Sequence, residues 1–191
     1  MKKYNLENQI HFITLDTNKK IRLFNNNGLC RIIIDNLKFY RRKFAFKLFG
    51  FVIMPDHIHL LILLGKKHNN ISRVMQDFKS HTAKEIINVI KTGRRKPSLS
   101  PYSDASEGSH LPQDYRWIEK GKIHTPSINK IWQKDFYDFN IYSEKKLEQK
   151  LNYIHYNPVR ASLCKKHEDW KWSSYHNYFL DDNSVIKIDR L

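Results

Sequence analysis

The sequence predicts an α+β fold, a ferredoxin-like antiparallel sheet with helices packed on one face. Two observations support this prediction. The chain of 191 residues reads as strand, helix, strand, strand, helix, strand, an order typical of this class. Its two central strands are separated only by Pro55 and Asp56, which favours a tight hairpin and therefore antiparallel pairing. The length suits one domain with a substantial core.

Each element in the first half of the chain has its own signal. Residues 10–16 (IHFITLD) are rich in β-branched and aromatic side chains and form the first expected strand. Apolar residues recur at helical spacing over residues 29–40, and cations follow where the helix dipole favours them. Residues 44–54 and 57–64 are apolar runs of strand length on either side of the hairpin turn.

The second expected helix begins after Asn70, a possible N-cap, and ends at Gly93. Its broad apolar face consists of Ile71, Val74, Met75, Phe78, Ile86 and Ile90. Residues 93–127 hold most of the prolines and show little periodicity, so we expect a long, partly mobile insertion and no separate domain. The chain is therefore expected to form a single domain over residues 1–180, followed by a C-terminal tail at 181–191.

The last strand and helix follow the insertion. Residues 128–141 (INKIWQKDFYDFNI) favour a strand. Ser143 is suited to cap a third helix that runs to about Asn157, where Pro158 is expected to stop it.

Composition points to a nucleic-acid partner. Lys and Arg number 34 against 19 Asp and Glu, a formal charge of +15, and 13% of residues are aromatic. A cationic surface without such a partner is the plainer alternative. No stretch reaches the roughly 18 apolar residues that span a bilayer, and no apolar signal core is present at the N-terminus. We expect a cytoplasmic, nucleoid-associated bacterial protein in which Cys30 and Cys164 are ordinary reduced thiols.

Two histidines stand one residue apart at the start of the second hairpin strand. Side chains at i and i+2 of a strand share a face, so His57 and His59 are expected side by side, with Ile58 on the other face. Neighbouring imidazoles on a rigid strand form half of a divalent-metal site. Two surface or core histidines remain the alternative until further ligands are found.

The third helix offers such groups along one edge. At about 100° per residue, one stripe of it is apolar and must face the sheet, namely Leu147, Leu151 and Ile154. Lys146, Lys150, Tyr153 and Asn157 fall together on a flank of that stripe. A phenol can act as a nucleophile, an amide oxygen can bind a metal, and ammonium groups can bind phosphate. Each residue alone also fits a structural role, as a packed ring, a helix cap or a solvated face.

The sequence resembles a known family at these same positions. The segment MPDHIHLLI is similar to the His-hydrophobic-His signature of single-tyrosine DNA transposases of the insertion-sequence 200-like kind. Three further segments resemble their branch associated with repetitive extragenic palindromes, the REP-associated tyrosine transposases: IWQKDFYDFNI, LNYIHYNPVRA and WKWSSYHNY. The resemblance runs from about residue 10 to 179.

The resemblance implies roles for particular residues. His57 and His59 match the metal-binding histidines, Tyr153 matches the nucleophile, and Asn157 stands at the third ligand position, where family members carry Gln. The family cleaves and rejoins single-stranded DNA near hairpins through a 5′-phosphotyrosine with Mg²⁺ or Mn²⁺, so the expected partner is single-stranded or hairpin DNA. We expect Lys146, Lys150, Lys79 and Arg160 to contact this DNA.

Two alternatives stay open. A non-catalytic protein could bind structured nucleic acid by stacking and charge, although such a protein would have no need of all four site residues. A relative that still cleaves DNA but no longer mobilises itself has the same sequence features. Trp132, Phe136 and Tyr137 are expected near the third helix as stacking platforms, and a homodimer is possible.

Overall fold

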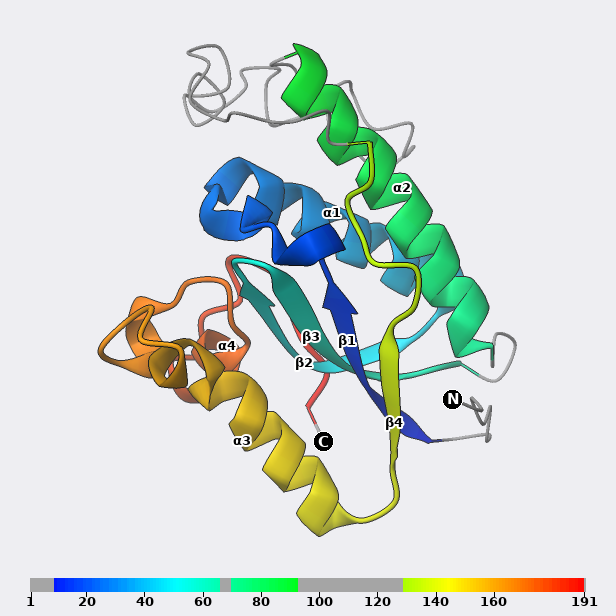
Figure 1. The fold of residues 1–191 in the computed structure, drawn as a ribbon. Helices are drawn as coiled ribbons and strands as arrows, with labels where there is room; N and C mark the ends of the chain where they lie inside the picture. The colour runs from blue at the N-terminus through cyan, green and yellow to red at the C-terminus, as the bar shows by residue number, and fades with distance from the viewer. Residues whose placement is uncertain (1–8, 66–69, 93–128, 191) are drawn as a thin grey trace.

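The computed structural model describes residues 9–65, 70–92 and 129–190. Its helices and strands are β1 (Ile10–Asp16), η1 (Asn18–Lys20), η2 (Leu23–Asn25), α1 (Asn27–Phe44), β2 (Lys47–Met54), β3 (His57–Leu63), α2 (Ile71–Thr92), β4 (Tyr137–Ile141), α3 (Glu144–Arg160), η4 (His167–Asp169) and α4 (Tyr175–Phe179). The strands form one antiparallel sheet in the order β2-β3-β1-β4. This arrangement confirms the α+β, ferredoxin-like prediction (Figure 1).

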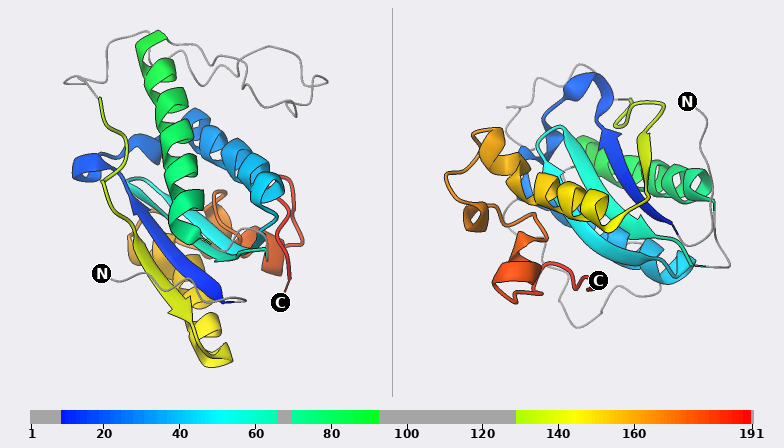
Figure 2. Two further views of the ribbon diagram at one scale, coloured as in Figure 1. Left: turned by 90° about the vertical axis from the view of Figure 1, so that its right-hand side faces the viewer. Right: turned by 90° about the horizontal axis from the view of Figure 1, so that it is seen from below.

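The helices do not all lie on one face of the sheet, which corrects that part of the prediction. α1 and α2 pack side by side (Figure 2) and bury the face that carries Ile13, Phe51 and Leu60. α3 packs on the opposite face through its apolar stripe, and the sheet lies between α2 and α3 (Figure 1). The reason is the alternation of strand side chains: Phe12, Val52 and Leu61 form a second apolar face, which also needs a cover.

Local signals fix where the helices begin. The side chain of Asn26 accepts a hydrogen bond from the Leu29 N–H and caps α1. Asn70 accepts from the Arg73 N–H before α2, and Ser143 accepts from the Lys146 N–H at the start of α3. The predictions of Asn70 and Ser143 as caps are thus confirmed. The expected insertion at 93–127 and the helix end at Gly93 lie outside the described residues.

The predicted strand at 128–141 is wrong in its first half, because only Tyr137–Ile141 joins the sheet. Trp132 is buried under α2, where its indole N–H donates to the Thr82 hydroxyl at 2.9 Å. It retains a single bridge to Thr17 of the neighbouring connection. The apolar side chains of Ile131 and Trp132 therefore pack in the part of the core that α2 covers.

α3 continues beyond Asn157, and the expected stop at Pro158 is wrong. Pro158 lies inside the helix, which ends at Arg160. The proline lacks the N–H of one intrahelical bond, but the Ala161 N–H still donates to the Asn157 carbonyl at 2.9 Å and closes the last turn. Because the helix continues, Arg160 lies two turns after Tyr153 on nearly the same side.

The C-terminal residues pack along β2. Ile186 and Ile188 are buried in the core beneath α1, and the Asp189 N–H donates to the Leu48 carbonyl at 2.8 Å. The segment before them also bonds to β2, because the Ile53 N–H donates to the Trp172 carbonyl. The β2 edge of the sheet is thereby covered over part of its length. None of the described helices is long and apolar enough to cross a lipid bilayer.

Candidate active site

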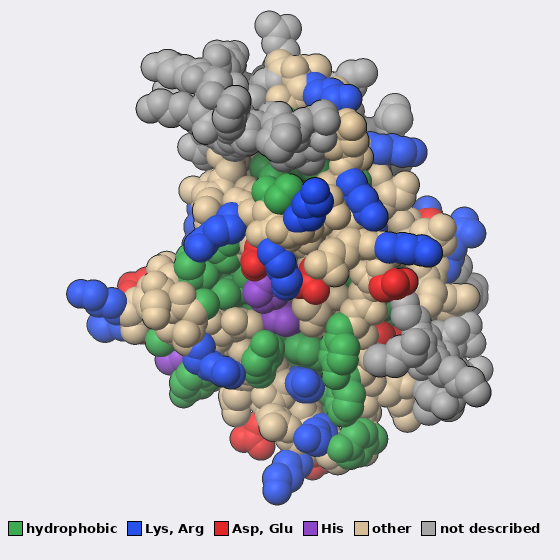
Figure 3. All heavy atoms as spheres, in the orientation of Figure 1, with side chains coloured by type: hydrophobic (Ala, Val, Ile, Leu, Met, Phe, Trp, Pro, Cys, Tyr) green, Lys and Arg blue, Asp and Glu red, His purple; other side chains and the backbone are tan. Residues whose placement is uncertain are grey.

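His57 and His59 lie side by side on the face of the sheet that α3 covers. Their ring centroids are 4.7 Å apart. In the β1–β3 register His57 stands opposite Asp16 and His59 stands opposite Thr14. The space-filling view shows histidine side chains near the middle of one face, with acidic, basic and apolar groups around them (Figure 3). The predicted pairing of the two imidazoles on one face is confirmed.

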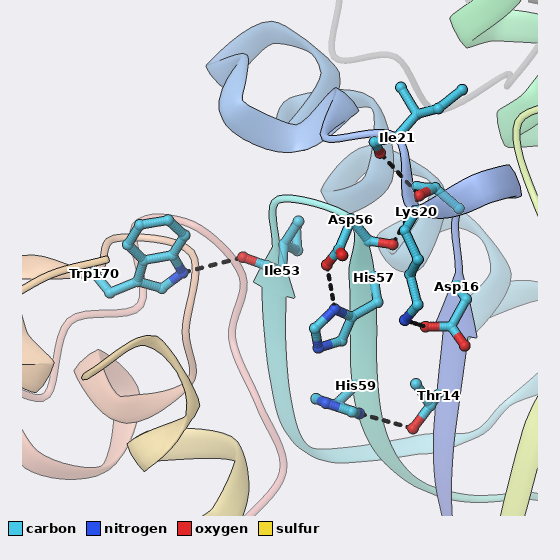
Figure 4. A network of polar contacts seen from close by, with 10 residues as sticks. Thr14, Asp16, Lys20, Ile21, Ile53, Asp56, His57, His59 and Trp170 are labelled. Carbon is cyan, nitrogen blue, oxygen red and sulfur yellow. Dashed lines mark hydrogen bonds and ion pairs between the residues drawn. The ribbon is translucent and has the colours of Figure 1, made fainter. Parts of the chain in front are cut away.

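Each imidazole is held through its Nδ1 atom (Figure 4). The Asp56 carboxylate accepts from the Nδ1–H of His57 at 2.5 Å, since a carboxylate offers no proton of its own. The Thr14 hydroxyl lies 2.8 Å from Nδ1 of His59. A neutral imidazole held in this way presents the lone pair of Nε2, the arrangement that histidine ligands of metals commonly show.

The buried position of His59 determines the chemical state of its ring. Its Nε2 atom is buried and has no hydrogen-bond partner within residues 9–65, 70–92 and 129–190, which leaves a polar group unsatisfied there. Burial, followed by the nearby charges of His57, Lys150 and Lys20, lowers the pKa of His59 to about 3. The imidazole is therefore neutral near pH 7, and in the tautomer whose Nδ1–H donates to the Thr14 hydroxyl the Nε2 lone pair carries no proton.

The helix phase brings one tyrosine of α3 to the histidines and turns another away. The Tyr153 ring lies edge-on to His59, with centroids 5.2 Å apart, and also contacts Phe12 at 5.9 Å. Tyr156 contacts His167 of η4 instead, with centroids 4.3 Å apart. Tyr153 is 37% exposed, so part of its surface is open to solvent. These contacts agree with the expected helix phase.

Cations of α3 surround the Tyr153 ring. The Lys150 ammonium lies 4.3 Å from the Phe12 ring centroid and 5.9 Å from that of Tyr153. Burial, followed by the nearby charge of Lys146, lowers the pKa of Lys150. The Arg160 guanidinium carbon lies 5.6 Å from the Tyr153 centroid. Lys150 and Arg160 therefore place positive charge where a phosphate would meet the phenol.

Two other predicted DNA contacts have different surroundings. The Lys146 ammonium donates to the Gln149 side chain one turn along its own helix, at 2.9 Å. Lys79 lies on α2, across the sheet from the histidine pair, and donates to the Lys134 carbonyl at 2.8 Å. The structure does not bring Lys79 to the site.

Asn157 carries an amide group on the same edge of α3 as Tyr153. It lies one helical turn after Tyr153, and its amide nitrogen is buried with no hydrogen-bond partner in the part of the chain that the structure describes. A half-turn of the amide exchanges its nitrogen and oxygen, so the same position can present an oxygen. Among the described residues no three His, Cys, Asp or Glu side chains could hold a metal. An amide oxygen is a further kind of metal donor, and Asn157 carries one on the Tyr153 side of α3.

Sequence reasoning missed the residues that support the imidazoles. Phe12 stacks on His59, with centroids 5.2 Å apart and planes 22° apart. It alternates with Thr14 on β1, which places both on the histidine face. That alternation, and the position of Asp56 directly before His57, were the available signals. The expectation that Trp132 is a stacking platform beside α3 is wrong, since Trp132 is buried beneath α2.

Comparisons with known proteins agree with this geometry. The family model described as Transposase IS200 like matches residues 4–100, about half of the chain, including both histidines. A protein assigned as a REP-associated tyrosine transposase in Haemophilus influenzae is 26% identical over 133 residues, which are 70% of this chain and 61% of that protein. The REP-associated tyrosine transposase of Escherichia coli is 32% identical over 62 residues, which are 32% of this chain and 38% of that protein.

A solved structure shares the fold. The structure of a REP-associated tyrosine transposase bound to a REP hairpin superposes with a TM-score of 0.60 at 18% identity, covering 93% of this chain and 82% of that one. This chain spans about three-fifths of the Haemophilus relative and less than two-fifths of the Escherichia relative. The match to the family model, supported by the shared fold, shows that the chain belongs to the IS200-like transposase family.

Proposed function

We propose that this protein cleaves and rejoins single-stranded DNA near hairpins, with Tyr153 as the nucleophile. The observation that carries the proposal is the contact between the Tyr153 ring and His59, whose buried Nε2 has no hydrogen-bond partner among the described residues. The phenol ring and the imidazole are thus neighbours on one face of the sheet. A protein that only bound nucleic acid would gain nothing from this arrangement.

The reaction conserves the phosphodiester bond energy. The Tyr153 oxygen attacks the scissile phosphorus and loses its proton, the bond from phosphorus to the 3′ oxygen breaks, and that oxygen leaves as a 3′ hydroxyl after gaining a proton. The DNA remains attached to the protein through its 5′ phosphate. Attack by a 3′ hydroxyl on this phosphotyrosine reverses the step and rejoins the strand, so no nucleotide cofactor is required.

The donor atoms fit a divalent cation such as Mg²⁺ or Mn²⁺. The two Nε2 atoms of His57 and His59 and an amide oxygen of Asn157 would hold it, and water and phosphate oxygens can complete the shell of such an ion. When bound, the ion acts as a Lewis acid on a phosphoryl oxygen. Asp56 and Thr14 keep the imidazoles oriented toward it.

Positive side chains of α3 position the DNA and assist the phenol. Lys150 lies beside the ring of Tyr153, and its ammonium favours the negative charge that develops on the phenol oxygen as the proton leaves. The Arg160 guanidinium also lies near the Tyr153 ring. A guanidinium can bind a phosphate group through two parallel hydrogen bonds. Lys146 would contact the backbone farther along the strand. The solved relative bound to a REP hairpin supports hairpin DNA as the partner.

The direct test is a cleavage assay. The purified chain is incubated with Mn²⁺ and labelled hairpins with single-stranded flanks, taken from repeats beside its own gene. We expect one labelled product with a free 3′ hydroxyl and one fragment that migrates with the protein. Omission of the metal, or His59→Ala, should abolish both. Hairpin binding without any cleavage under these conditions would instead favour a non-catalytic binding protein.

A further inference from the structure

A strained turn lies directly beside the histidine pair. Lys19 and Lys20, in the connection between β1 and α1, have φ angles of 54° and 55°. This left-handed region is unfavourable for residues with a side chain, and strain of this kind persists only where surrounding contacts fix the backbone. Such strain is concentrated at functional sites.

Buried hydrogen bonds hold this turn against the hairpin that carries the histidines. The N–H and the hydroxyl of Thr17 both contact the Asp56 carbonyl at 2.9 Å, and the same hydroxyl lies 2.8 Å from the Ile21 carbonyl. Thr17 itself is fully buried. Farther along, the Phe24 N–H donates to the Pro55 carbonyl at 2.9 Å. Residues 17–24 are therefore fixed to the Pro55–Asp56 turn that leads into His57.

The fixed turn directs one lysine into the site. The Lys20 side chain extends past His57 toward Asp16 (Figure 4), and its ammonium pairs with the Asp16 carboxylate at 2.5 Å. Asp16 is the cross-strand neighbour of His57. Lys20 thus adds a cation from the β1 side of the histidine pair, whereas Lys150 and Arg160 approach from α3.

We propose that Lys20 binds a phosphate of the DNA strand next to the scissile phosphate, with Asp16 holding its ammonium in place. The ammonium carries three donors, and the pair with Asp16 occupies one of them, so further donors can meet phosphate oxygens. This inference rests on the proposed function, because it assigns a strand contact to the same site. A purely structural role explains the turn poorly, since an exposed ion pair stabilises a fold by little.

Binding to chemically altered DNA tests the contact. The probes are hairpins with a single-stranded flank that carry one neutral methylphosphonate, moved phosphate by phosphate through the flank. Affinities are measured without metal for the wild type and for Lys20→Gln. At one position we expect neutralisation to weaken wild-type binding about tenfold, the size of one charge-assisted hydrogen bond. Lys20→Gln should bind unmodified DNA about tenfold more weakly than the wild type does. A methylphosphonate at that one position should not weaken the binding of Lys20→Gln further.

Lys19→Gln is the matched control. It removes the same charge from an exposed neighbour with the same left-handed backbone, so the two variants share any effect on overall charge or turn strain. Lys19→Gln should remain sensitive to every methylphosphonate that affects the wild type, and Lys20→Arg should restore part of the lost affinity. Equal, additive losses for Lys19→Gln and Lys20→Gln at all positions would overturn the contact, even if the wild type cleaves DNA. If the wild type shows the expected Lys20 contact but never cleaves DNA, only the proposed cleavage reaction is overturned. If it binds none of the probes, the Lys20 contact and the proposed function are both overturned.

Discussion

The Tyr153 ring meets the His59 imidazole edge-on, with centroids 5.2 Å apart and ring planes at 70°. His59 is fixed on its other sides by the stacked Phe12 ring and by the Thr14 hydroxyl. α3 is fixed to the same face of the sheet by its buried Ile154. Nucleophile and proposed metal ligand therefore come from separate elements whose mutual position is set by a packed core.

Removal of either imidazole should separate chemistry from binding. We expect His57→Ala and His59→Ala to abolish metal-dependent cleavage while hairpin affinity falls less than about threefold, because affinity rests on many phosphate contacts. His81→Ala, on the α2 side of the sheet, is the matched control and should retain cleavage. Crystals soaked with Mn²⁺ should show an anomalous peak near both Nε2 atoms, and a peak elsewhere would refute the assignment of these ligands.

The amide of Asn157 should matter through its oxygen. Asn157→Ala should weaken Mn²⁺ binding roughly 10- to 100-fold, the usual effect of disturbing a metal site. Asn157→Gln, which keeps the amide and adds one methylene, should retain more of the affinity. Calorimetric titration with Mn²⁺ measures both variants. Unchanged Mn²⁺ affinity in Asn157→Ala would show that this residue is only a half-buried helix side chain.

Binding should depend strongly on salt and on DNA structure. The excess of 34 Lys and Arg over 19 Asp and Glu predicts that phosphate neutralisation provides much of the affinity. A plot of log affinity against log salt concentration should therefore have a steep negative slope. A hairpin with an unpaired flank should bind better than a blunt duplex of equal length, because the flank can reach the α3 site. Equal affinities for the two at moderate salt would argue against a single-strand site.

The stability of the fold should fall as the pH is lowered, in part through His155. This residue is buried, contacts the Ser174 hydroxyl at 3.0 Å, and has a pKa lowered to about 4, chiefly by burial and then by His167. The unfolded chain takes up this proton near pH 6.5, so stability is full above that pH and is lost as pH falls from there toward 4. By pH 5 the loss should reach about 2 kcal/mol.

The variant His155→Gln isolates this contribution. It should be less stable than the wild type at pH 7, because it disturbs a packed site, but it should lose less stability between pH 7 and pH 5. Urea unfolding at both pH values measures the difference. His59 contributes in the same direction, since its pKa is also lowered, and its share remains in both proteins. A pH dependence identical to that of the wild type would exclude His155 as a source.

Sequence predicted the parts of the fold that depend on local chemistry. The hairpin turn follows from the backbone preferences of Pro55 and Asp56. The caps follow from the side-chain oxygens of Asn70 and Ser143, which accept backbone N–H bonds at the predicted places. The phase of α3 followed from its apolar stripe, which is why Tyr153 and Tyr156 could be told apart.

Tertiary packing decided what the sequence could not. The sequence of α3 shows that one side of the helix is apolar, but it does not determine which face of the sheet that side covers. The sequence around Trp132 is typical of a strand, but in the structure its indole N–H donates to the hydroxyl of Thr82 on α2. Pro158 stops most helices, yet here the following turn is closed by Ala161. The left-handed backbone of Lys20 lies in a connection that the buried Thr17 ties to the Asp56 carbonyl. That contact joins two turns that are far apart in the sequence.

The identity of the nucleophile is the central claim, and the covalent product tests it most directly. The protein is trapped with a cleaved hairpin and Mn²⁺, digested, and analysed by tandem mass spectrometry to locate the residue that carries the 5′ phosphate. Tyr153→Phe should give no cleavage and no adduct while it keeps its fold and hairpin affinity, and Tyr156→Phe, the matched control on the same helix, should keep measurable activity. The account predicts that the wild-type adduct lies on Tyr153. An oligonucleotide attached through its 5′ phosphate to any other residue would contradict it.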